Sequence, residues 1–193
     1  SDVASILLDG GGDFADSSFD AMKVDVRRLD ITAILPDAKA RNLTGRLLLL
    51  GPLARPRFDY VARADEFAIG TTGFTQVKAA GEGASFGDTL RIPVQLTATR
   101  VTGTGDLAED VLRNLDVDGT VTVADGRVRG DNIRLRTDQI DGLVRLDANL
   151  NTRRYDVAAK GTIRDFQIDG FGQVDLNANV VIRPDAGGFV SVN

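Results

Sequence analysis

Hydrophobic and polar residues alternate along most of this chain, and the alternation is clearest between Val117 and Ile182. Small or apolar residues fall on every second position there, while Asp, Asn, Thr, Arg and Lys fill most of the positions between them. A period of two places the two sets on opposite faces of a β-sheet. The pattern therefore predicts an all-β fold, built on a long antiparallel sheet with one apolar face and one polar face.

Strands are also expected before Val117, and turn residues divide the sequence at short intervals. The expected strands are Val3–Asp9, Met22–Val26, Leu43–Leu50, Arg57–Ala64, Gly73–Gly83 and Leu90–Arg100. Gly10–Gly12 should end the first of them, and Pro93 indicates an edge or a bulge in the last. Asp-Gly pairs at positions 118–119, 125–126, 141–142 and 169–170 are typical of hairpin turns. Consecutive strands should therefore be neighbours in the sheet.

One segment, residues 106–115, departs from the alternation. Its apolar residues have helical spacing and are Leu107, Val111, Leu112 and Leu115. Asp106 and Glu109 fit the positions of a capping box. We expect a short helix here, which either plugs the apolar face or connects strands at one rim. A second short helix is expected near residues 37–42.

The apolar face must be covered by something, and its candidate lining is aliphatic. The expected lining residues are Leu47, Leu49, Val94, Leu96, Val121, Val123, Val144, Leu146, Leu150, Val157, Ile163, Val174, Leu176, Val180 and Ile182. From the pattern alone, a structural or adhesive β-sandwich or β-solenoid with a self-packed core is one interpretation, and a ligand-lined face is the other. Nine Phe, two Tyr and no Trp are few aromatic residues for a well-filled sandwich of 193 residues.

The composition of the chain argues against several kinds of binding and catalysis. A net charge of −5 argues against non-specific nucleic-acid binding, which needs a basic surface. The absence of His and Cys removes Ser-His-Asp and Cys-His catalysis and thiolate metal sites. The Asp residues are scattered, and those in turns such as Asp116–Gly119 suit turn geometry as well as calcium. We expect no enzyme, no cofactor and no metal. The pairs Arg27–Arg28 and Arg153–Arg154 fit either anionic head groups or solvated strand ends.

Three stretches resemble a known family. They are Gly51–Gly83 (GPLARPRFDYVARADEFAIGTTGFTQVKAAGEG), Val117–Leu135 (VDGTVTVADGRVRGDNIRL) and Arg154–Thr162 (RYDVAAKGT). Their Gly-Pro-Leu turn and their order of strand, Asp-Gly and strand are similar to the TamB family (translocation and assembly module), within the AsmA-like group. The resemblance extends over most of the chain from about residue 22. The C-terminal domain of that family is not evident, so the chain resembles a middle segment.

The resemblance implies a sheet that curls lengthwise into a half-pipe, called a β-taco, as one elongated segment over residues 1–193. It implies an inner-membrane-anchored protein that crosses the periplasm of a Gram-negative bacterium. The groove would hold phospholipid acyl chains and serve lipid transport and outer-membrane biogenesis. The parent protein would meet a TamA-type barrel in the outer membrane.

Overall fold

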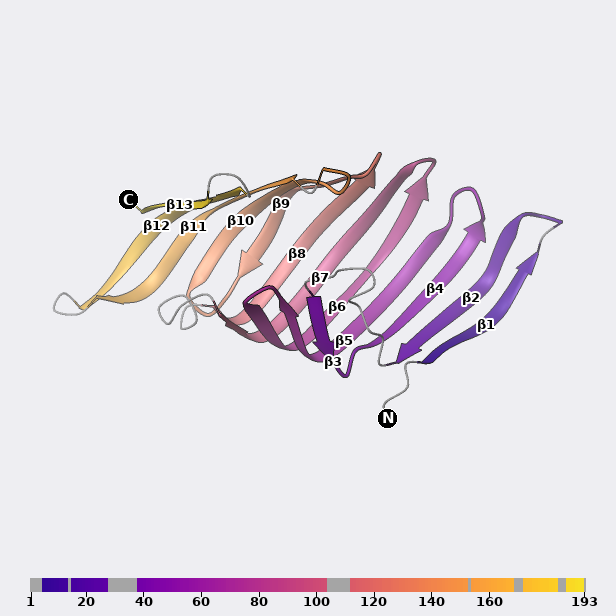
Figure 1. Ribbon diagram of the computed structural model, residues 1–193, viewed down its shortest axis with the longest axis horizontal. Helices are drawn as coiled ribbons and strands as arrows, with labels where there is room; N and C mark the ends of the chain where they lie inside the picture. Colours follow the sequence, from indigo (N-terminus) through magenta and orange to yellow (C-terminus); the bar gives the residue numbers. More distant parts are fainter. Residues whose placement is uncertain are drawn as a thin grey trace.

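The computed structural model describes residues 5–13, 15–27, 38–103, 112–152, 154–168, 172–183 and 187–192. Every regular element within these residues is a β-strand, and all of the strands join one open antiparallel sheet (Figure 1). The strands are β1 (Ser5–Asp13), β2 (Ser18–Arg27), β3 (Ala38–Arg41), β4 (Thr44–Pro52), β5 (Arg57–Ile69), β6 (Thr72–Phe86), β7 (Thr89–Thr102), β8 (Arg113–Ala124), β9 (Arg127–Arg136), β10 (Ile140–Asn149), β11 (Arg154–Ile168), β12 (Gly172–Arg183) and β13 (Gly187–Val192). The predicted all-β antiparallel fold is therefore confirmed.

The order of strands in the sheet follows the order of the chain. Twelve strands run β1-β2-β4-β5 and onward to β13, and only β3 lies off this path, paired with β5. Except around β3, each strand is antiparallel to its predecessor in the chain, as the spacing of the turn residues predicts. Asp125 and Gly126 form one such turn with φ values of 48° and 70°, the positive pair that a type I′ hairpin requires.

The pairing register carries one row of small and apolar residues across all twelve strands. The row runs Ile6, Val26, Gly45, Ala62, Ala79, Leu96, Val117, Leu135, Gly142, Gly161, Ala178 and Val192. Directly opposite residues in antiparallel strands share a face. The row therefore defines one continuous surface, which we call the apolar face.

Several strands contain a residue in the left-handed region that bends the strand. Gln76, Asn114, Asn132 and Asp165 have φ values of 51°, 52°, 55° and 52° in β6, β8, β9 and β11. Register shifts flank Asn132 and Asp165, which identifies them as bulges. Bulges bend a strand and increase its twist, and the sheet in Figure 1 is curved and twisted.

Little of this sheet is deeply buried. Among the described residues, seven apolar side chains are buried and no large one is fully enclosed. Ala98, Val101 and Leu115 form a small cluster at one margin, where β7 ends and β8 begins. Phe74, Val77, Leu96, Leu112, Val117 and Leu135 pack against it. No second sheet covers the apolar face within the described residues.

The predicted helices are not seen. Leu115 lies in strand β8 opposite Ala98, and Leu112 immediately precedes that strand. Leu107 and Val111 lie outside the described residues. Residues 38–41 form strand β3 in place of the second helix. Leu115 belongs to the buried cluster and Leu112 packs against it, so the contacts of these two leucines do not require a helix.

Some predicted strand ends are also wrong. Strand β1 continues through Gly10–Gly12, with a register shift between Asp9 and Gly11. The Asp-Gly pairs at 118–119 and 141–142 lie inside β8 and β10, and the pair at 169–170 lies outside the described residues. Pro93 lies in β7, which is an interior strand, and the residues between Arg91 and Gln95 form no pairs with β6.

Candidate functional site

The apolar face collects nearly all of the residues that the alternation selects as lining. Direct pairs place Leu47 opposite Tyr60, Val121 opposite Gly130, and Leu146 opposite both Gly130 and Val157. The strand pairing places the other predicted lining residues on the same face. They are Leu49, Val94, Leu96, Val123, Val144, Ile163, Val174 and Leu176, together with Val180 opposite Ala159 and Ile182 opposite Val157. Leu150 differs, because it lies in the turn after β10 and is 59% exposed.

The lining side chains are half-buried. This holds for all twelve of the predicted lining residues whose side chains the structure describes within strands. A filled core would exclude solvent from most of these side chains, because protein interiors pack as densely as organic crystals. The apolar face therefore keeps aliphatic surface in contact with solvent over most of its length.

Glycine makes the apolar face locally deeper. Gly142 and Gly161 lie opposite each other, and a Cβ added at Gly161 would lie 2.7 Å from the Gly142 Cα. A depression of about 80 Å³ lies here, and its apolar walls include Leu135, Ile140 and Val144. Since a liquid water occupies about 30 Å³, the depression has room for two or three groups of that size. The pair Asp141–Gly142 thus marks a close strand approach and not a turn.

Two aromatic side chains lie across glycines of the next strand. A Cβ at Gly83 would lie 2.1 Å from the Phe58 Cζ, and one at Gly81 would lie 2.8 Å from the Tyr60 Cε1. The Tyr60 hydroxyl donates a hydrogen bond of 2.8 Å to the Pro93 carbonyl, beside the gap in β6–β7 pairing. Burial raises the pKa of Tyr60. Alternation along the sequence already predicts that both rings lie on the apolar face. Their contacts with the two glycines depend in addition on how β5 pairs with β6.

The opposite face is held by ion pairs between neighbouring strands. Arg46 Nε donates to Asp25 Oδ1 at 2.8 Å, between β4 and β2. The Arg46 hydrogen bond lowers the pKa of Asp25, and the Arg127 hydrogen bond lowers the pKa of Asp147. These carboxylates therefore stay ionised at neutral pH. We call this surface the polar face.

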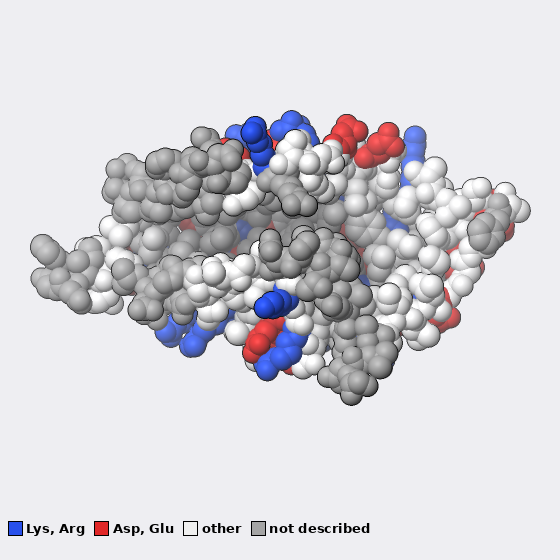
Figure 2. Space-filling view, in the orientation of Figure 1, with Lys and Arg blue, Asp and Glu red and all other residues white. Residues whose placement is uncertain are grey.

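A space-filling view shows how charge is distributed. Figure 2 shows a hollow along the middle of the molecule, with most of the visible Lys, Arg, Asp and Glu side chains near its upper and lower margins. Uncharged side chains dominate the described surface between these margins.

The described residues contain no group of three or more His, Cys, Asp or Glu side chains able to hold a metal ion. No polar or charged residue among them is buried. The described residues form no helix, so no helix among them is long and apolar enough to span a membrane.

Comparison with models of protein families, with curated proteins and with solved structures gives no match for this chain. The fold and the face described above define the class: an all-β protein with a single open antiparallel sheet of strands in chain order.

Proposed function

We propose that the apolar face is a groove that binds lipid, with acyl chains against the aliphatic lining and head groups in water. The observation that carries the proposal is the row of small and apolar residues that crosses twelve strands without interruption, and whose members from Val26 to Ala178 are half-buried. An ordinary sheet face of this length is covered by a second layer. Within the described residues, no such layer is present.

The dimensions and energetics suit an acyl chain. Twelve strands at a spacing of about 4.8 Å extend about 53 Å from the first strand to the last. Each buried methylene contributes about 0.8 kcal/mol, so ten would contribute about 8 kcal/mol before the cost of ordering the chain. Most of the lining residues named above are aliphatic, and the chain has only nine Phe, two Tyr and no Trp, which suits a flexible ligand.

The resemblance to the TamB family supports a wider role. We infer that the chain is a segment of an inner-membrane-anchored protein that crosses the periplasm of a Gram-negative bacterium. It would carry phospholipid toward the outer membrane and contribute to outer-membrane biogenesis, with a TamA-type barrel as partner of the parent protein. The groove itself is passive, because acyl chains exchange along an apolar surface without a chemical step.

The test is the lipid content of the protein purified without detergent. We expect mass spectrometry of an organic extract to find phospholipid in near-stoichiometric amount. The variant Leu146→Asp with Leu176→Asp places two charges on the apolar face and should lose this lipid. A matched control is Leu143→Asp, because Leu143 is on the same strand as Leu146 but on the polar face, between Arg134 and Lys160.

Circular dichroism must show that both variants retain a β-type spectrum. A lipid-free extract from folded wild-type protein would contradict the proposal and favour a self-packed sandwich or solenoid. Equal lipid in the double variant and the wild type would place the lipid elsewhere.

A further inference from the structure

The strands β9, β10 and β11 carry a local excess of positive charge on an acidic chain. They contain eight Arg and Lys residues and five Asp residues, which gives a net charge of +3, whereas the whole chain has −5. A local excess of one sign attracts ligands of the other sign, even when the net charge of the protein is unfavourable.

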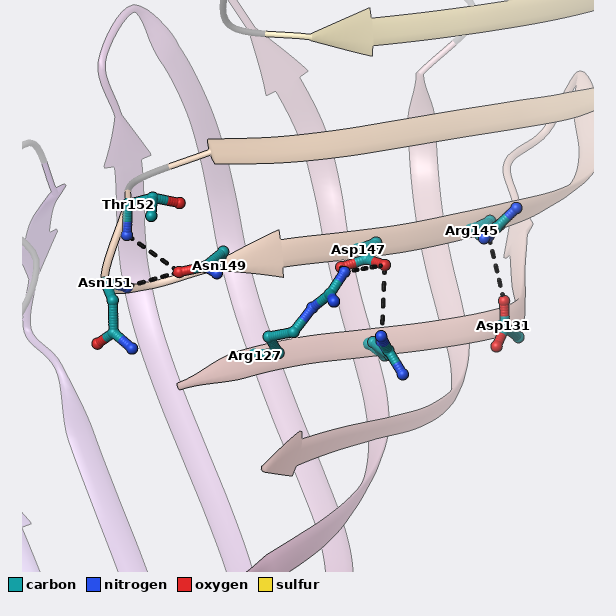
Figure 3. A network of polar contacts seen from close by, with 8 residues as sticks. Arg127, Asp131, Arg145, Asp147, Asn149, Asn151 and Thr152 are labelled. Atoms are coloured by element: carbon teal, nitrogen blue, oxygen red, sulfur yellow. Dashed lines mark hydrogen bonds and ion pairs between the residues drawn. The ribbon is translucent and has the colours of Figure 1, made fainter. Parts of the chain in front are cut away.

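Asp147 organises the arginines at one margin of this region. Arg127 Nη2 lies 2.9 Å from both carboxylate oxygens of Asp147, and Arg129 Nε lies 3.6 Å from Oδ2 (Figure 3). The Asp147 side chain is 26% exposed, whereas those of Arg127 and Arg129 are 46% and 57% exposed. The carboxylate is thus recessed, and the guanidinium groups that it holds form the outer surface.

A hollow of about 640 Å³ lies beside these side chains, where β9 begins, β10 ends and β11 begins. Its lining residues, which we call the rim site, are Arg127, Arg145, Asp147, Asn149, Thr152, Arg154, Tyr155, Asp156 and Ala158. The three arginines come from three adjacent strands. Tyr155 pairs with Ala148, which pairs with Val128, so it has the register of the apolar face. Arg127, Asp147 and Asn149 have the register of the polar face. The hollow therefore lies on the polar face near the ends of these strands, with Tyr155 beside it at the margin of the apolar face.

We propose that the rim site binds the phosphate of an anionic lipid head group while the acyl chain of the same lipid lies on the apolar face. This inference rests on the lipid-binding function proposed above. Guanidinium groups bind phosphate through parallel, charge-assisted hydrogen bonds, and Asn149 and Thr152 add polar groups. A soluble phosphate ester offers the same chemistry without the acyl chain, so the test must separate the two sources.

The test compares two lipids that differ only in the phosphate: a monoacylglycerol and the lysophosphatidate with the same acyl chain, both below their aggregation concentrations. We expect the wild type to bind lysophosphatidate at least tenfold more tightly, which corresponds to about 1.4 kcal/mol. Arg127→Gln with Arg154→Gln should abolish this preference and leave monoacylglycerol binding unchanged.

The chain supplies a matched control at the opposite margin. Arg134 and Arg164 also lie on β9 and β11, and they flank Asp141 at 3.3 Å and 3.8 Å. Arg134→Gln with Arg164→Gln makes the same change in charge on the same strands and should retain the preference. Equal loss in both double variants would show a diffuse charge effect and overturn the rim site.

The remaining outcomes separate the two proposals. Binding of neither lipid would overturn the lipid-binding function itself. Equal binding of both lipids by the wild type would support the groove and overturn the rim site. Glycerol phosphate that binds the wild type as tightly as lysophosphatidate would assign the rim site to a soluble phosphate ester and overturn the lipid head group.

Discussion

Truncation of two leucines should show whether the apolar face is open in solution. Leu115 is 6% exposed and belongs to the buried cluster at the margin. Leu115→Ala should cost about 3 kcal/mol, because it removes buried methylenes and leaves a cavity. Leu146 is half-buried on the open part of the face. Leu146→Ala should cost only about 1 kcal/mol, since half of the lost area was already in water and solvent fills the space.

The assay is urea or thermal unfolding of delipidated protein. For a domain of this size the two costs correspond to losses of about 9 °C and about 3 °C in the melting temperature. Leu143→Ala on the polar face, where Leu143 is 37% exposed, should cost no more than Leu146→Ala. Added lipid should increase the cost of Leu146→Ala and leave that of Leu115→Ala unchanged. Equal, large costs for both in delipidated protein would refute the open face and show that another layer covers it.

Two further predictions concern contacts between strands. Gly161→Ala should destabilise the sheet by about 1–3 kcal/mol in urea unfolding, because its Cβ would lie 2.6 Å from the Asp141 carbonyl oxygen. The control is Gly45→Ala in the same row, whose added Cβ would meet nothing closer than 3.7 Å and should be nearly neutral. Equal effects of the two substitutions would contradict the close approach of the strands at Gly161. Tyr60→Phe should cost about 1 kcal/mol at pH 7 by loss of the hydrogen bond to Pro93. Because the pKa of Tyr60 is raised in the folded protein, the unfolded chain loses the hydroxyl proton at a lower pH than the folded protein does. The stability of the wild type should therefore fall above about pH 10, and that of Tyr60→Phe should fall less. Parallel plots of stability against pH for the two proteins would contradict this.

The faces of the sheet could be predicted because alternation depends on only two neighbouring positions. Leu146 and Arg145 occupy opposite faces in any extended strand, whatever lies on either side. Turns were harder, because Asp-Gly is compatible with both a hairpin and a strand interior. Asp125–Gly126 forms a turn, whereas Gly119 lies within β8, where an added Cβ would be 2.9 Å from the Ile133 Cα. That contact depends on the pairing of β8 with β9, which the local sequence does not contain.

The bulges and the margin of the apolar face could not be predicted for a related reason. Asn132 is an ordinary polar residue in the alternation, yet its left-handed conformation puts both Gly130 and Ile133 on the apolar face. Leu150 would lie on the apolar face if β10 continued, because it follows Leu146 at an even spacing, but β10 ends at Asn149. Arg127, Arg145 and Arg154 come from three different strands, so their convergence depends on the register of those strands.

Pairing in chain order makes the sheet a modular, nearly one-dimensional object. Each strand on the main path depends on the strands immediately before and after it, as in repeat proteins where stability is a sum over neighbours. A hairpin inserted or deleted in the middle would leave every other pair intact and would change the length of the apolar face by about 10 Å. Duplication of hairpins is thus a direct route by which the length of such a sheet can change while its other strand pairs stay as they are.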